Sequence, residues 1–221
     1  MNILITSGPT REPIDTVRFI TNLSTGKTGA ALADYFQGQG HEVTFLHGGD
    51  SIKPNKAREI LPFEAFLDLN QAMQEILSRG HIDVVFHGAA VGDYSVEQIR
   101  LPHETLQGGA DFKIDSQEKV ELVLKRNFKI LNKIKSYSVK KKISVVGFKF
   151  TDSREKKDWL VAVRKIYEEG GVDLVVHNDL SERSGEDGPR FRLIEMDEKS
   201  LECESRLELA RGLENWLRRH L

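Results

Sequence analysis

Short apolar segments alternate with helical patterns along the whole chain, and this alternation limits the fold more than any other feature. The expected strands span residues 2–7, 42–47, 84–87, 144–150 and 173–177. Each is rich in Val, Ile, Leu or Phe, and continuous apolar strands are typical of parallel sheets covered by helices on both faces. The expected helices span residues 26–39, 63–78, 127–136, 154–169 and 207–219. The pattern therefore predicts a doubly wound, mostly parallel α/β sheet.

Two later segments depart from this alternation. Apolar and polar residues alternate on either side of Asp197-Glu198-Lys199, which predicts an antiparallel hairpin at about 190–205. Pro and Gly interrupt any regular element within residues 98–111, so we expect a flap at about 95–112. The residues leave open whether it is a flap, an interface arm or a tolerated surface insertion. The whole chain, 1–221, is expected to form a single Rossmann-like α/β domain.

Composition excludes several classes of protein. Charged residues make up 30% of the 221 residues and the formal net charge is −2, so no broad nucleic-acid-binding face is expected. Cys203 is the only cysteine, which rules out a disulfide framework and a cysteine-based zinc site. No apolar run approaches the roughly 18 residues of a membrane span, and no signal peptide is recognisable. We therefore expect a cytoplasmic protein without membrane contact.

The connection between the first expected strand and the first helix is unusually long and polar. Such connections usually have about two to six residues, whereas this one runs from Ser7 to Gly26. Exposed amides at a helix N-terminus favour an anion, so a phosphate group is expected here. Simple N-capping by Ser24 or Thr25 is the alternative. The candidate ligand contacts are Ser7, Gly8, Thr10, Ser24, Thr25 and Gly26.

Familiar catalytic motifs are absent from the chain. The dinucleotide fingerprint Gly-x-Gly-x-x-Gly and the complete Walker loop are both missing, as are a nucleophile elbow and metal-ligand spacing of the histidines. Small residues follow the third expected strand at 88–92, where a nucleotide can approach the backbone. Asp93 after them suits a ribose hydroxyl, or else caps a turn. On its own, Lys113 is expected to be an ordinary solvent-exposed lysine.

Four segments, in order, resemble phosphopantothenate–cysteine ligase of coenzyme A biosynthesis, in its stand-alone form without the decarboxylase domain. The segments are Ile5-Thr6-Ser7-Gly8-Pro9-Thr10-Arg11-Glu12-Pro13-Ile14-Asp15, Val17-Arg18-Phe19-Ile20-Thr21-Asn22-Leu23-Ser24-Thr25-Gly26-Lys27, Ala89-Ala90-Val91-Gly92-Asp93-Tyr94, and Val146-Gly147-Phe148 with Asp173-Leu174-Val175-Val176-His177-Asn178-Asp179-Leu180-Ser181. The resemblance implies that 4′-phosphopantothenate is activated by CTP or ATP with Mg²⁺. The resulting acyl-nucleotide is then attacked by the amine of cysteine. It also implies a homodimer whose flap crosses between subunits.

The resemblance also implies roles for individual residues. Asn22 matches the family's catalytic asparagine, whose amide contacts the acyl-phosphate intermediate, and Lys113 matches a lysine that contacts the nucleotide. Asp93 matches a nucleotide-binding aspartate, and Lys165 is a looser match to a phosphate-binding lysine. The base and ribose are expected to contact His87, Gly88, Ala89, Phe128, Lys129, Ile130, Leu131 and Phe148.

This chain departs from the family pattern at the positions that read the base. Asn127-Phe128-Lys129-Ile130 replaces the usual Asn-Pro-Asp-Ile, so the choice between CTP and ATP stays open. Two other functions remain alternatives at this point. One is an NAD(P)-dependent reductase, favoured by the strand–loop–helix opening. The other is a non-catalytic nucleotide-binding protein of the same fold.

Overall fold

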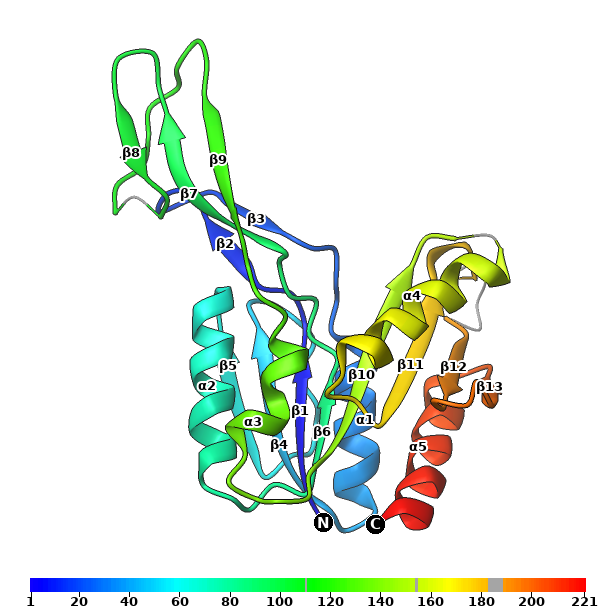
Figure 1. Ribbon diagram of the computed structural model, residues 1–221. Helices are drawn as coiled ribbons and strands as arrows, with labels where there is room; N and C mark the ends of the chain where they lie inside the picture. Colours follow the sequence, from blue (N-terminus) through cyan, green and yellow to red (C-terminus); the bar gives the residue numbers. More distant parts are fainter. Residues whose placement is uncertain (110, 154, 183–188) are drawn as a thin grey trace.

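One eight-stranded sheet forms the centre of the computed structural model, which describes residues 1–109, 111–153, 155–182 and 189–221. Across the sheet the strands are β13 (Ser200–Cys203), β12 (Phe191–Ile194), β11 (Leu174–Asp179), β10 (Ser144–Thr151), β6 (Val84–His87), β1 (Asn2–Ser7), β4 (Glu42–Gly48) and β5 (Glu59–Phe63). The strands from β11 to β5 pair in parallel, and β12 and β13 add an antiparallel edge (Figure 1). This confirms the predicted fold class, including the C-terminal hairpin.

Helices cover both faces of this sheet. Along β1 the side chains alternate between two cores, because successive residues of a strand point to opposite faces. Ile3 and Ile5 pack with α1 (Lys27–Gly38) and α5 (Arg206–His220). Leu4 packs in a second core with α2 (Phe66–Ser78), α3 (Ile134–Tyr137) and α4 (Lys156–Glu169). Over the described ranges, no helix is long and apolar enough to cross a membrane.

An arm rises from the carboxyl edge of the sheet (Figure 1). It consists of the antiparallel strands β7 (Tyr94–Arg100), β8 (Thr105–Gln107) and β9 (Glu121–Arg126), with β7 in the middle. The hairpin of β2 (Arg11–Pro13) and β3 (Phe19–Thr21) lies beneath it. Ser95 Oγ donates to the buried Glu12 at 2.7 Å, so the hairpin and the arm are bonded where they meet.

Asp15 fastens the tip of this hairpin to the connection between β8 and β9. Its carboxylate accepts from the Arg18 guanidinium and from the Ile114 amide at 3.0 Å. Arg18 Nη2 also donates to the Ile114 carbonyl at 2.8 Å. The hydrogen bonds from Arg18 hold the pKa of Asp15 well below its usual range. The Asp15–Arg18 pair therefore remains charged and fixes the base of the arm.

The structure corrects several sequence-based expectations. The segment expected to be irregular, 98–111, contains regular structure, because residues 98–100 end β7 and residues 105–107 form β8. Only part of the expected helix at 127–136 is helical, as a 3₁₀ turn, η1 (Ile130–Lys133), followed by α3. Strand β5 was not expected at all. Ala110, within the expected flap, and Arg154, at the expected start of a helix, lie outside the described residues.

The opening loop also has a structural explanation that the sequence did not indicate. Most of its length forms the β2–β3 hairpin, which supports the arm. Gly8 adopts φ of +80°, and a Cβ there would lie 2.4 Å from Ser51 Oγ. Only glycine fits this close approach at a positive φ. Loop length is therefore not by itself evidence for a bound phosphate.

Candidate functional site

A pocket of about 450 Å³ opens at the carboxyl ends of β6 and β10. Its walls come from the loop after β6, the end of β9, η1, the end of β10 and one side of α4. Ligands of doubly wound sheets bind beyond the carboxyl ends of the strands, near the reversal of strand order. Strand β1 lies between β6 and β4 at that reversal, so the pocket occupies the expected place for a ligand.

The fold brings most of the nucleotide-binding candidates together in this pocket. Those that line it are His87, Ala89, Asp93, Phe128, Lys129, Ile130, Leu131, Phe148 and Lys165. They come from segments up to 78 residues apart, between His87 and Lys165. The sequence therefore identified a set of residues that share one cavity.

Basic side chains dominate the charge of the pocket wall. Lys129 Nζ donates to Asp93 Oδ1 at 2.5 Å, and Lys165 Nζ lies 3.9 Å from Glu169 Oε1. Arg126 and Lys149 also line the pocket, and over the described ranges no carboxylate pairs with either of them. Each carboxylate of the wall, Asp93 and Glu169, thus has a lysine beside it. The positive charges of Arg126 and Lys149 remain available. Such a surplus suits a polyphosphate.

Aromatic rings form the apolar part of the wall. Phe128 packs edge-on against Phe66 with ring centroids 4.8 Å apart, yet 47% of Phe128 remains exposed. Phe148 and the 46% exposed Phe150 line the same pocket from β10. A base can stack on an exposed ring at low entropic cost, because the ring is already held in place.

His87 contributes a neutral ring to the floor of the pocket. It is only 7% exposed, and its Nδ1 lies 2.9 Å from Thr6 Oγ1. Burial lowers the pKa of His87 to about 4. At neutral pH the imidazole therefore adds no charge, and Thr6 Oγ1 also accepts from the Ala89 amide at 3.3 Å. This arrangement fixes the loop after β6.

Asn22 lies beside the pocket and is anchored to its loop. Its Nδ2 donates to the carbonyls of Ala90 and Val91, at 3.2 and 3.1 Å. Both hydrogens of the amide are thereby used, which leaves Oδ1 as the free group. Donation of an N–H from Asn22 to an acyl-phosphate, as the resemblance implies, requires one of these bonds to exchange.

Other candidates from the opening loop do not line the pocket. Ser7, Gly8 and Thr10 are buried. Ser7 Oγ donates to the Gly26 carbonyl at 3.1 Å, and Thr10 Oγ1 accepts from the Gly92 amide at 2.9 Å. Gly88 likewise bonds Thr6 through its amide, at 3.0 Å. The bonds of Thr10 and Gly88 hold β1 and the loop after it to the loop after β6.

Ser24, Thr25 and Gly26 lie at the start of α1. Gly26 is the N-cap residue with φ of +73° and has no side chain to cap the helix, while Thr25 Oγ1 accepts a long bond of 3.5 Å from the Lys27 amide at the start of α1. Lys113 lies elsewhere, exposed beside Ile114 at the base of the arm and outside the pocket wall. Within this chain, Lys113 therefore lies apart from the other nucleotide-binding candidates.

Arg126 and Lys149 are not among the candidates from the sequence, and Asn127 is named there only as part of the segment that departs from the family pattern. Asn127 Nδ2 donates to the Gly92 carbonyl at 3.0 Å, which ties the end of β9 to the pocket loop. The position of Lys149 at the carboxyl end of an apolar strand is the one signal that identifies it as a candidate. Over the described ranges, no group of three His, Cys, Asp or Glu side chains is placed to hold a metal ion.

Comparison with known proteins decides the family. The model of the DNA/pantothenate metabolism flavoprotein C-terminal domain matches residues 1–220. The chain belongs to this family. The match confirms the family to which the four sequence segments pointed. One relative is the coenzyme A biosynthesis bifunctional protein CoaBC of Thermococcus kodakarensis, which is 34% identical to this chain over 178 residues. That alignment covers 80% of this chain but 41% of CoaBC, so the chain spans less than half the length of this relative.

Two solved structures have the same fold as this chain. The DNA/pantothenate metabolism flavoprotein from Streptococcus pneumoniae superposes with a TM-score of 0.87 at 26% identity, over 100% of both chains. A Cab2 variant, solved in complex with phosphopantothenate-cysteine, superposes with a TM-score of 0.75 at 19% identity. That superposition covers 99% of this chain and 88% of the Cab2 chain, and it shows the shared fold.

Proposed function

We propose that the chain ligates 4′-phosphopantothenate to cysteine through an acyl-nucleotide intermediate. The observation that carries the proposal is the 450 Å³ pocket, which unites nine of the residues implied by the family resemblance. A relative named for coenzyme A biosynthesis and a fold neighbour solved with phosphopantothenate-cysteine support the same reaction. The buried, uncrosslinked Cys203 suits a reducing cytoplasm.

The nucleotide binds in this pocket. Phe128 and Phe148 take the base, and Asp93 takes a ribose hydroxyl when it exchanges its bond to Lys129. Lys149, Arg126 and Lys165 neutralise the phosphates. Mg²⁺ bound to the triphosphate would supply further charge neutralisation, and such ions need few protein carboxylates because they usually retain waters. The protein accelerates the reaction by holding the reactants and balancing their charge.

The carboxylate of phosphopantothenate attacks the α-phosphate, and pyrophosphate leaves. The N-terminus of α1, with Ser24, Thr25 and Gly26, suits the phosphate of this substrate, since side-chain capping among the described residues there is one long bond, from the Lys27 amide to Thr25 Oγ1. Asn22 is adjacent to the pocket loop and contacts the reacting acyl group. The amine of cysteine then displaces the nucleoside monophosphate and forms the amide.

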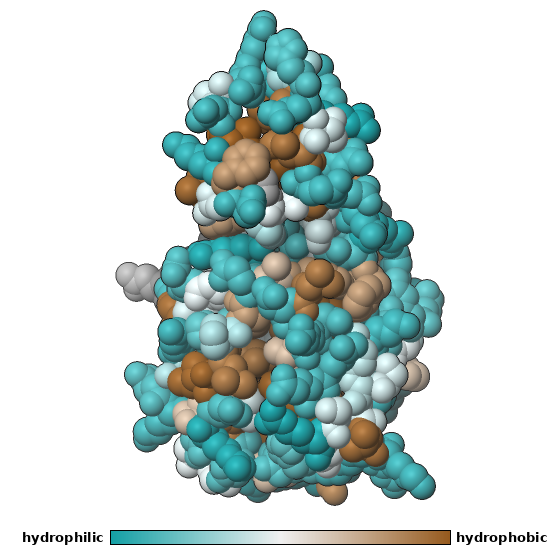
Figure 2. Space-filling model, turned by 90° about the vertical axis from the view of Figure 1, so that its left-hand side faces the viewer, coloured by the Kyte–Doolittle hydropathy of each residue, from teal (hydrophilic) through white to brown (hydrophobic). Residues whose placement is uncertain are grey.

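A second copy of the chain completes the site by supplying Lys113. Exposed apolar side chains gather on the arm and its base, as Figure 2 shows for one side of the molecule. They include Val17, Tyr94, Phe112, Val120 and Leu124, each 43–58% exposed. An apolar surface of this kind favours association. Phe112→Asp is therefore expected to convert dimers to monomers in sedimentation velocity and to reduce turnover, whereas Asp111→Asn retains the dimer.

The nucleotide is CTP or ATP, and the Asp93–Lys129 pair lies where the choice is made. The test mixes protein, phosphopantothenate, cysteine and Mg²⁺ with each nucleotide and measures pyrophosphate and the amide product. We expect release with at least one nucleotide, dependent on phosphopantothenate. Absence of release with both nucleotides would refute the proposal.

A further inference from the structure

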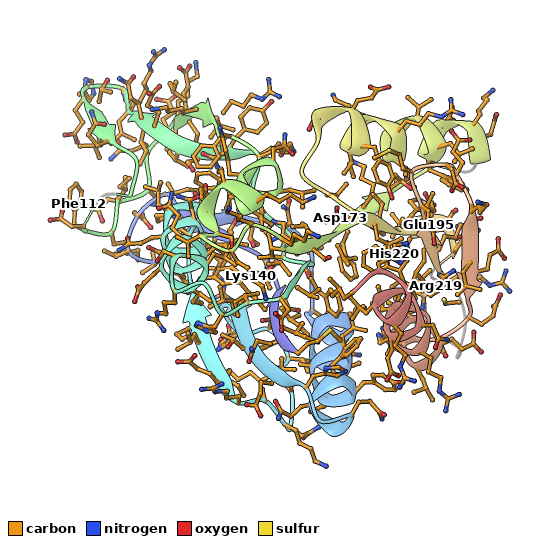
Figure 3. All side chains as sticks on the ribbon, turned by 60° about the horizontal axis from the view of Figure 1, so that its bottom comes forward. Phe112, Lys140, Asp173, Glu195, Arg219 and His220 are labelled. Atoms are coloured by element: carbon orange, nitrogen blue, oxygen red, sulfur yellow. The ribbon has the colours of Figure 1, made fainter. Side chains whose placement is uncertain are left out.

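A second pocket, of about 310 Å³, lies on the underside of the sheet, at the amino ends of β10 and β11. Figure 3 looks toward this underside, with Lys140, Asp173 and His220 labelled around it. No residue in the wall of this underside pocket also lines the nucleotide pocket, within the part of the chain that the structure describes. The two cavities are therefore separate sites at opposite ends of the parallel strands.

Lysines dominate the wall of the underside pocket. Its charged and polar residues are Lys135, Lys140, Lys141, Lys142, Ser144, Asp173 and His220. The loop between α3 and β10 supplies three consecutive lysines, and α3 supplies the fourth. Four ammonium groups thus share the wall with one side-chain carboxylate, that of Asp173, and with Leu221, although the chain as a whole carries a formal charge of −2. The positive charge is local to this cavity.

Two of the lysines are neutralised within the fold. Lys135 Nζ donates to Asp173 Oδ1 at 2.7 Å, and the other oxygen of Asp173 accepts from the Val145 amide at 2.8 Å. Lys140 Nζ donates to Asp83 Oδ1, and Asp83 Oδ2 accepts from the Asn2 amide at 2.7 Å. Each carboxylate is already shared between a lysine and a backbone amide. Neither has a free oxygen for a further cation.

Lys141 and Lys142 are the surplus charges. Both are exposed, and neither pairs with a carboxylate over the described ranges. The bonds of Lys140 and Lys135 fix two positions in the wall, and Lys141 and Lys142 line the same cavity next to Lys140. Ser144, at the start of β10, adds a hydroxyl to the same wall. An anion with several charged oxygens relieves the repulsion among these lysines and accepts from several donors at once.

We infer that the underside pocket binds a small phosphate-bearing anion, at a site separate from the nucleotide pocket. Phosphate oxygens match ammonium and hydroxyl donors, and lysine binds phosphate as a point charge. The volume accommodates one or two phosphate groups. A free phosphate, a pyrophosphate and the phosphate of a nucleotide all share this chemistry.

A tryptophan next to the pocket provides a local reporter. His220 lines the wall and stacks on Trp216 with ring centroids 4.6 Å apart and an interplanar angle of 22°. The chain contains two tryptophans. In a Trp159→Phe background, Trp216 is therefore the sole source of tryptophan fluorescence. Pyrophosphate bound in the nucleotide pocket does not touch Trp216, so the two binding events are distinguishable.

The experiment titrates pyrophosphate into Trp159→Phe protein carrying either Lys141→Gln with Lys142→Gln or the control pair Lys157→Gln with Lys199→Gln. Both pairs remove the same charge, and the control lysines are exposed residues outside the pocket. We expect a saturable change in the control and at least about a tenfold weaker affinity in the pocket variant. Equal affinities of the pocket variant and the control for pyrophosphate would overturn the inference. So would a fluorescence change with sodium chloride that equals the change with pyrophosphate at the same ionic strength.

Calorimetry on the same lysine variants with both tryptophans intact repeats the comparison if Trp159→Phe unfolds. Inorganic phosphate, pyrophosphate and a nucleoside monophosphate are titrated in separate arms. Tighter binding of one probe, lost in the pocket variant, identifies the source of the phosphate group. If no probe distinguishes the pocket variant from its control, the underside pocket is not an anion site.

Discussion

Replacement of Lys149 by glutamine tests the nucleotide pocket where sequence reasoning was silent. Lys149 projects from the carboxyl end of β10 into the pocket wall and is half-buried. It has no carboxylate partner over the described ranges, so Lys149→Gln leaves no acidic group unpaired. A hydrogen bond to a charged group contributes about 1.5–3 kcal/mol. Since about 1.4 kcal/mol corresponds to a factor of ten, loss of this contact should weaken nucleotide binding by roughly 10- to 150-fold.

The measurement is a calorimetric Kd for CTP and ATP with Mg²⁺, together with the KM for the nucleotide from pyrophosphate release. Lys157→Gln is the matched control, since Lys157 lies at the start of α4 outside the pocket wall. Thermal unfolding shows whether each variant retains its fold. If the Kd of folded Lys149→Gln stays within about twofold of the control, Lys149 does not contact the phosphates and the proposed orientation of the nucleotide is wrong.

Three further predictions follow from the contacts described above. Asn22→Ala should leave the Kd for nucleotide nearly unchanged and reduce amide formation by about a hundredfold; an equal loss of affinity would make Asn22 a binding residue. Asp15→Asn should increase hydrogen exchange in the arm, because it weakens the Arg18 contact, and unchanged exchange relative to Asp111→Asn would contradict this. Burial lowers the pKa of His87 and of His177 to about 4. Unfolded histidine takes up a proton near pH 6.5, so the free energy of unfolding should fall from about pH 6.5 to pH 4. In urea titrations at pH 7 and pH 5, the double variant with glutamine at both positions should lose less stability than the unsubstituted chain, and an equal loss would refute the assignment.

The central sheet could be predicted because its strands are continuous apolar runs buried on both faces. Strand β5 escaped prediction for a physical reason, since Glu59-Ile60-Leu61-Pro62-Phe63 is a short edge strand containing a proline. Edge strands tolerate proline and need no continuous apolar run. The arm strands escaped for a related reason. Strand β7 reads Tyr94-Ser95-Val96-Glu97-Gln98-Ile99-Arg100 and is mostly solvated, so nothing local separates it from a loop.

The residues of the candidate site also fall into those that the sequence could predict and those that it could not. His87 ends the buried strand β6, and Ala89 and Asp93 lie in the loop that follows, where topology alone predicts ligand contact. Thr10 was misleading because its hydroxyl bonds a backbone amide 82 residues away, which no local pattern records. Lys149 lies within a strand, where a lysine ordinarily reads as a solvent-facing residue. Its orientation toward the pocket depends on the packing of α4 against β10.

The underside pocket has a practical consequence for protein engineering. The amide of Asn2 bonds Asp83, Asp83 bonds Lys140, and Lys140 lines the same cavity as Leu221. Figure 1 shows both ends of the chain at this edge, away from the arm. An affinity tag or fused domain at either end therefore emerges beside the lysines and leaves the nucleotide pocket and the arm uncovered. Tagged protein is suitable for turnover and oligomer measurements, whereas anion titrations require the tag to be cleaved.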